Sequence, residues 1–219
     1  MSSDSDSINE RRRNRGNSLA TLSISGLLKN LRLYINLLDA GGILRRYFIM
    51  NGFDGIMTVM GIIMGSYMTH LIDPKFIVGA SIGASLAMGI SGFVGAFITE
   101  RAERIKEIKD LEKSLFTSLE DSLLKQAVNV VTALAALVDA FAPMLFSVIS
   151  VSPFILAIYS IIPIEAALMG SVILTSILLF LLGAFLARVS DESVLKYGLC
   201  MLVSGLLISL IGVFLGHFL

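Results

Sequence analysis

The chain lacks tryptophan and has only one cysteine and two histidines among its 219 residues. A lone cysteine, Cys200, excludes an intrachain disulfide framework. Charged residues are also scarce, at 16%, whereas a soluble domain carries about a quarter. Because 55% of the residues are hydrophobic, a single soluble core of this length cannot bury them all. The composition excludes an ordinary water-soluble enzyme and predicts an all-α, polytopic membrane protein. The net charge of zero gives no indication of a nucleic-acid partner.

The N-terminal region divides into two parts before the first long apolar run. Residues 1–17 are rich in Ser, Asp and Arg with almost nothing to bury, which predicts a disordered tail. Residues 18–42 carry apolar side chains at helical spacing from Ile24 to Leu38, and Gly41 and Gly42 are expected to end this helix. It is either an amphipathic helix in the membrane interface or a helix packed on the rest of the protein.

Residues 43–219 are predicted to form a membrane domain of five spans of about 20 residues each, the length that crosses the hydrocarbon core. The predicted spans are 47–69, 76–98, 127–149, 164–187 and 194–216. Pro153 and Pro163 lie in an apolar connection, 150–163, that either extends the third span or re-enters the membrane. Small residues recur every four positions in the second span, which predicts close helix packing on two faces.

Basic residues indicate the orientation of these spans. Sixteen of the seventeen Lys and Arg residues would lie on one side, and only Lys75 on the other. The positive-inside rule makes the crowded side cytoplasmic. We therefore expect a cytoplasmic N-terminus and an external C-terminus in an integral membrane protein, with the cell membrane as the expected location.

Two carboxylates fall inside predicted spans. Asp54 lies about 12 Å into the first span, and Asp139 about 18 Å into the third. Such groups usually face the bundle interior and mark ion paths, although a hydrogen-bonded structural Asp is the alternative. Met57 and Met64 follow Asp54 at helical spacing, and Met88 lies in the second span. Thioethers are soft metal ligands, so these five residues are candidates for an ion path, but methionine is also a common packing residue.

The stretch 99–126 is predicted to continue the second span as a cytoplasmic helix. Four glutamates, Glu100, Glu103, Glu107 and Glu112, are its candidate metal ligands. Glu103 and Glu107 repel each other at i, i+4 spacing, and a divalent cation would relieve this repulsion. The alternative is a solvated helix in which Glu100 pairs with Arg104 and Asp110 with Lys113. The two histidines lie at the outer ends of spans and show no metal-ligand spacing.

Four segments together resemble the vacuolar iron transporter family, in its prokaryotic-like branch. They are RRYFIMNGFDGIMTVMGIIMG, SLAMGISGFVGAFITERAERIKEIKDLEKSL, ALVDAFAPMLF and LLFLLGAFLARVS, within residues 45–217. The resemblance implies a homodimer whose first spans flank an ion path, and export of Fe(II) or Mn(II) from the cytoplasm in exchange for protons. It matches Asp54 to the family's path aspartate and Met88 to its second-span methionine. Where many members carry a second-span glutamate, this chain has Gly92.

The function expected from these observations is a divalent-metal transporter in a lipid bilayer, and not an enzyme. No permanently bound cofactor is expected, since Fe(II) or Mn(II) would be the transported ion. Two other functions stay open. One is a membrane-bound enzyme with a di-metal carboxylate centre, although the chain has no Glu-x-x-His pair. The other is a membrane scaffold or metal sensor that does not transport.

Overall fold

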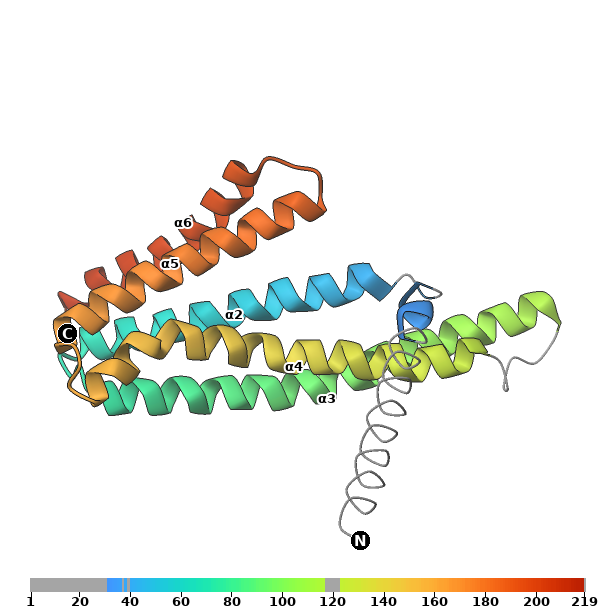
Figure 1. Cartoon of the computed structure of the whole chain (residues 1–219), viewed down its shortest axis with the longest axis horizontal. Coiled ribbons are helices and arrows are strands. Elements are labelled where there is room, and N and C mark those ends of the chain that lie inside the picture. The colour runs from blue at the N-terminus through green and yellow to red at the C-terminus, as the bar shows by residue number, and fades with distance from the viewer. Residues whose placement is uncertain (1–30, 37, 39, 117–122, 219) are drawn as a thin grey trace, which may run out of the picture. The chain divides into compact units, whose positions relative to one another are not determined.

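The structure, a computed structural model, describes residues 31–36, 38, 40–116 and 123–218. All regular structure in these residues is helical, so the predicted all-α class is confirmed. Five helices in this part of the chain are long and apolar enough to cross a membrane, which indicates an integral membrane protein. They are α2 (Ala40–Met68), α3 (Pro74–Leu115), α4 (Leu123–Ile158), α5 (Ile164–Val189) and α6 (Val194–Gly216) (Figure 1).

The ends of the helices correct one expectation. Gly41 and Gly42 do not end a helix but lie in the first turn of α2. Residues 31–36 are helical. Residues 18–30 of the expected amphipathic helix lie outside the described residues, as does the tail 1–17. Elsewhere the chain turns through residues with positive φ, which L-residues adopt rarely outside turns. These are His70, Phe116, Ser160 and Asp191.

The two longest helices extend beyond the second and third predicted spans. Helix α4 continues through Pro143 and Pro153 to Ile158, so the segment 150–158 extends the span and does not re-enter. Helix α3 continues without interruption to Leu115, as the absence of Gly and Pro predicts. Its 42 residues correspond to about 63 Å, roughly twice the thickness of the hydrocarbon core.

The chain separates into two compact units. One comprises residues 1–41 and 103–131, and the other comprises residues 42–102 and 132–219. In the first unit, Tyr34 donates a hydrogen bond to Gln126 (3.5 Å). Its buried apolar residues, among those described, are Ala40, Ile108, Ala127, Val128 and Val131. The end of α3 and the start of α4 thus belong to the first unit, and the rest of both helices belongs to the second.

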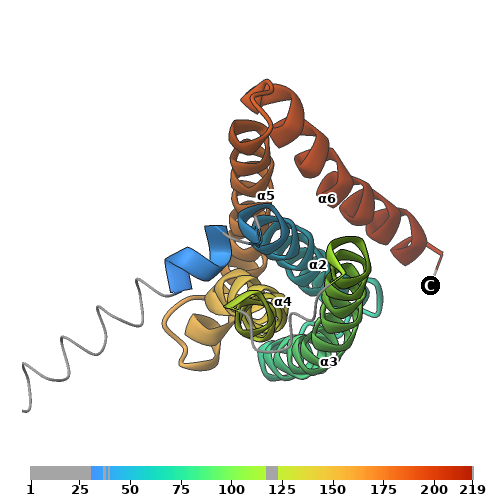
Figure 2. The ribbon, with the colours of Figure 1, turned by 90° about the vertical axis from the view of Figure 1, so that its right-hand side faces the viewer.

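In the second unit, glycines allow α2, α3 and α4 to approach closely. A Cβ atom added to Gly55 on α2 would lie 2.6 Å from the carbonyl oxygen of Pro143 on α4. One added to Gly89 on α3 would lie 2.9 Å from the carbonyl oxygen of Ala140. Ser147 on α4 also donates to the carbonyl of Gly55 (3.2 Å). The membrane parts of the three helices therefore form a tight bundle (Figures 1 and 2).

Helix α6 follows α5 at its start and reaches α2 at its end. Three buried glycines at seven-residue spacing make these contacts. Gly198 faces Phe180 and Gly205 faces Leu179, both on α5, whereas Gly212 faces Met64 on α2. From the α5 side of this interface, Gly183 packs against the backbone of Tyr197 and Gly198. The pair consequently diverges from α2 toward the end where α2 begins (Figure 1).

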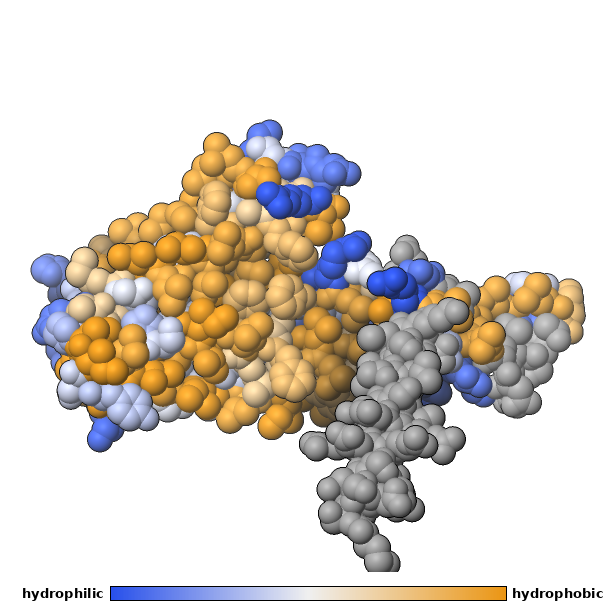
Figure 3. Space-filling view, in the orientation of Figure 1, coloured by the Kyte–Doolittle hydropathy of each residue, from blue (hydrophilic) through white to orange (hydrophobic). Residues whose placement is uncertain are grey.

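The outer surface of the second unit is largely hydrophobic (Figure 3). Large side chains such as Ile90, Met169 and Leu210 are more than half exposed, as expected of helices that face lipid. The small residues of α3 divide between two environments. One column is at least partly buried: Ala80, Ala84, Gly92 and Ala96. The other column is exposed: Gly79, Gly83, Ala87, Ser91 and Gly95. Within the described residues, α3 therefore packs on one face and not on the two expected.

Replacing Gly183 by alanine should separate α5 from α6. The new methyl group would lie 2.7 Å from the Cα atom of Gly198, and a backbone cannot move aside as a side chain can. We expect Gly183→Ala to destabilise the fold by about 1–3 kcal/mol, the usual cost of overpacking. Gly79→Ala is the matched control, since a Cβ there meets nothing within 4 Å and alanine favours the helix. SDS unfolding followed by circular dichroism measures both, and equal stability of the two variants would contradict the proposed contact.

Candidate functional site

Polar side chains form a stripe along α2 in the otherwise apolar bundle of the second unit. Tyr47, Asn51, Asp54 and Thr58 follow one another at i, i+4, i+7 and i+11, which places them on one face of the helix. Gly55, which packs against Pro143 of α4, is the residue after Asp54 in this part of α2. The stripe therefore faces groups on α3 and α4 with which it can bond.

Asp139 on α4 is the buried acid of this site, with 6% of its surface exposed. The side-chain amide of Asn51 donates a hydrogen bond to its carboxylate. The same amide donates to the backbone carbonyl of Tyr47 (3.0 Å), which fixes its orientation. A buried carboxylate without a partner is costly, so Asn51 explains how α4 can carry an acid at this depth.

Gly92 on α3 provides the space that the Asp139 carboxylate occupies. A Cβ atom added at Gly92 would collide with Oδ2 of Asp139. The Asp139 carboxylate thus fills the space that a side chain at position 92 would need. The bundle has an acid at this level, contributed by α4.

Glu100 extends the acidic site by two turns along α3. It is buried, with 4% of its surface exposed, and the hydroxyl of Tyr47 donates to its Oε1 atom (3.0 Å). The guanidinium of Arg46 lies 4.0 Å from the same atom. Contacts therefore lead from Glu100 through Tyr47 and Asn51 to Asp139, and we call these four residues the acidic column.

Asp54 and Met88 lie next to the acidic column. Asp54 is exposed within the protomer and lies three residues beyond Asn51 on the same face of α2. Half-buried Met88 accepts a hydrogen bond from the Thr58 hydroxyl through its sulfur (3.5 Å). The structure therefore brings three of the five candidate path residues to the α2 stripe: Asp54, Met88 and Asp139.

Met57 and Met64 lie elsewhere on α2. Met57 packs against the apolar cluster of Ile56 and Phe146, and buried Met64 belongs to another cluster and contacts Gly212. Met57 and Met64 were expected to share a face of α2 with Asp54. Both lie about a quarter turn or more from the centre of the polar stripe and therefore face other neighbours. They are packing residues in the described protomer.

The other three glutamates lie in the first unit. Glu103 is exposed, Glu107 forms an ion pair with Arg104 (2.9 Å), and Glu112 is half-buried. The expected pair of Asp110 with Lys113 is confirmed at 3.6 Å, but the expected pair of Glu100 with Arg104 is wrong, because Arg104 pairs with Glu107. Among the described residues, no three His, Cys, Asp or Glu side chains converge to hold a metal ion.

Comparison with known proteins adds one relative. The chain is similar to an uncharacterized protein of Methanocaldococcus jannaschii, with 28% identity over 169 residues, which cover 76% of this chain and 85% of the relative. No family model matches the chain. No solved structure matches it either. The function therefore has to be argued from the site itself.

Loss of Asn51 should destabilise the protein through Asp139. Asn51→Ala removes the amide that bonds the buried carboxylate, and we expect a cost of about 1–3 kcal/mol, as for other buried groups left unpaired. Asn129→Ala, on the exposed face of α4, is the matched control and should cost less than about 0.5 kcal/mol. In a double-mutant cycle with Asp139→Ala, unfolding should show coupling of about 0.5–3 kcal/mol. Strictly additive costs would contradict the hydrogen bond.

Proposed function

We propose that this protein is a membrane transporter that exports Fe(II) or Mn(II) from the cytoplasm in exchange for protons. The observation that carries the proposal is the acidic column, with Asp54 beside it, in a bundle whose helices are long and apolar enough to span a membrane. A carboxylate near the bilayer centre costs about 2.5–3.5 kcal/mol on insertion scales, so such groups usually serve an ion or proton path. Carboxylate oxygens and a thioether also suit these metals.

We further propose a homodimer. Asp54 is exposed within the protomer although its helix is apolar, and a carboxylate that faces lipid is unfavourable. A second copy would cover Asp54 and double the number of ligands available at the site. The exposed small-residue column of α3 supports the same assembly, because small residues allow helices of two copies to approach closely.

The proposed direction of transport follows from the charge distribution. Basic residues gather at the end of the bundle where α2 begins and α3 leaves the apolar region, which the positive-inside rule makes cytoplasmic. Glu100 then lies toward the cytoplasmic end of the acidic column. Glu103, Glu107 and Glu112 would collect metal ahead of it, with ligands completed between copies.

Asp54 should be required for transport and dispensable for folding. Asp54→Asn keeps the shape of the side chain and removes the charge that we place in the path. In proteoliposomes with an acidic lumen, we expect the wild-type protein to take up Mn(II) or Fe(II) as lumenal pH rises, and the variant to lose most of this flux. Asp73→Asn, in the exposed turn between α2 and α3, is the matched control and should transport normally.

Comparison of the variants separates the possible outcomes of this assay. Full flux with Asp54→Asn would reject the path role of Asp54. Metal binding by the wild-type protein without any flux would reject transport and favour a sensor. Circular dichroism and size-exclusion chromatography of each variant show whether a loss of flux reflects misfolding.

Substitution of the exposed glutamates Glu103 and Glu107 should weaken metal binding, whereas the effect on the stability of α3 should differ between the two positions. Glu103→Gln removes like-charge repulsion with Glu107 and should stabilise α3 by about 0.2–0.5 kcal/mol. Glu107→Gln removes the same repulsion and also the ion pair with Arg104, so the two effects should largely cancel. Both should weaken Mn(II) binding in calorimetric titration, and binding should also weaken as pH falls, because protons compete for carboxylates.

The control for this titration is Glu165→Gln, an exposed acid in the first turn of α5. Unchanged affinity and stoichiometry in the Glu103→Gln/Glu107→Gln protein would reject the metal-collecting role. The proposal for Asp54 would then rest on the acidic column alone.

A further inference from the structure

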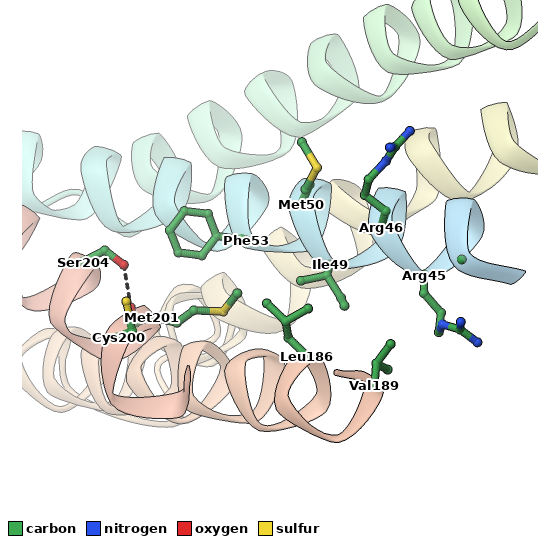
Figure 4. A pocket seen from close by; sticks show the side chains of 11 residues that line it. Arg45, Arg46, Ile49, Met50, Phe53, Leu186, Val189, Cys200, Met201 and Ser204 are labelled. Carbon is green, nitrogen blue, oxygen red and sulfur yellow. Dashed lines mark hydrogen bonds between the residues drawn. The ribbon is translucent and has the colours of Figure 1, made fainter. Parts of the chain in front are cut away.

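A cavity of about 440 Å³ lies in the second unit, between the start of α2, the end of α5 and the start of α6 (Figure 4). Its volume is within the range of about 300–1,000 Å³ found for ligand sites. Most of the wall is apolar, formed by Ile49, Phe53, Leu186 and Met201 among others, and Arg45 and Arg46 lie at one end. The proposed transport site does not include this cavity.

The packing of α6 explains why the cavity exists. Gly183 and Gly198 hold α6 against α5 near the start of α6, whereas Gly212 and Gly216 pack against α2 near its end. The two contacts leave α2 apart from the α5–α6 pair at the end that carries the arginines (Figure 4). The cavity is therefore built into the helix arrangement.

The two arginines supply positive charge at this end of the cavity. Both are exposed. Among the described residues, no carboxylate lies within salt-bridge distance of Arg45. Arg46 lies 4.0 Å from Glu100 and 5.7 Å from the centre of the Tyr47 ring, so no close hydrogen bond to a carboxylate occupies its N–H groups. Arginine is well suited to bind phosphate through two parallel hydrogen bonds.

The depth of the cavity matches an amphiphile that spans the interface. Phe53 lies seven residues beyond Arg46, or about 10 Å farther along α2. Ser204 lies ten residues beyond the start of α6, or about 15 Å along it. A ligand that fills the cavity therefore has an anionic end at the level of the lipid headgroups and an apolar part that enters the hydrocarbon region.

We propose that this cavity binds an anionic phospholipid, whose phosphate lies at the end flanked by Arg45 and Arg46 and whose acyl chain lies along Ile49, Phe53 and Met201. A small soluble anion would use the arginines but leave the apolar wall unfilled. A second copy of the chain would have to bring an acid to the arginines as well as an apolar surface to the wall. In the proposed orientation this end faces the cytoplasmic leaflet, where anionic lipids gather.

Cys200 provides a probe of the cavity, because it lines the wall, is exposed and is the only cysteine of the chain. The full chain in detergent with phosphatidylcholine is titrated with phosphatidylglycerol, and its alkylation by N-ethylmaleimide is followed by mass spectrometry. We expect phosphatidylglycerol to slow alkylation. Each variant is compared with its own rate in phosphatidylcholine, so that a changed thiol reactivity does not count as binding.

The arginine variants measure the contribution of charge. Arg45→Gln and Arg46→Gln should each raise the half-protecting concentration of phosphatidylglycerol roughly fivefold, and the double variant roughly thirty-fold. Arg101→Gln, an exposed arginine of α3 that does not line the cavity, is the matched control and should leave protection unchanged.

Two further controls test whether protection arises in the cavity. Leu199→Cys with Cys200→Ser moves the thiol to an exposed neighbouring position outside the wall, where phosphatidylglycerol should give no comparable protection. Glycerol phosphate, which has no acyl chain, should not protect Cys200.

Three results would overturn the proposal. Equal protection by glycerol phosphate would show an anion site that holds no lipid. Protection that is insensitive to Arg45 and Arg46 would remove the headgroup contact. Slow alkylation in phosphatidylcholine alone would show that protein, from a second copy or from residues 1–30, already covers the cavity.

Discussion

The close approach of α2, α3 and α4 around the Asp139 carboxylate is the constraint on which the site depends. Gly92 leaves room for the carboxylate, and Asn51 donates to it. Pro143 has no N–H, so the carbonyl of Asp139 lacks its usual partner one turn on, and α2 packs over this stretch through Gly55. A larger residue at Gly55 or Gly92 would separate the helices that the hydrogen bonds join. The two apolar clusters provide the rest of the packing in this bundle.

Much of this fold could be predicted from the chain alone. Long apolar runs identify the helices, and the bounds of α6 agree with the predicted fifth span. The absence of Gly and Pro after Ile98 correctly extends α3, although only the structure shows where it ends, at a Phe116 with positive φ. The 4-3-4 spacing of Tyr47, Asn51, Asp54 and Thr58 was also visible in the sequence and could have revealed the polar stripe before the structure did.

The partners of these residues could not be predicted in the same way. Helical spacing groups Met57 and Met64 with Asp54, but helix packing decides which edge of a broad face meets α5 and α6. Glu100 looks like the first member of a solvated acidic stripe, and it is buried because Tyr47 of another helix reaches it. Contacts between residues 53 or 88 positions apart have no local signature, so Tyr47 and Asn51 were missed.

The collision between a side chain at position 92 and Asp139 makes these two positions depend on each other during evolution. A glutamate at position 92 would bring a second carboxylate into space that Asp139 already fills. Removal of Asp139 alone would leave Asn51 without its acceptor and the bundle without its acid at that level. An exchange of the acid between α3 and α4 therefore needs two compensating substitutions, and each is unfavourable when it comes first.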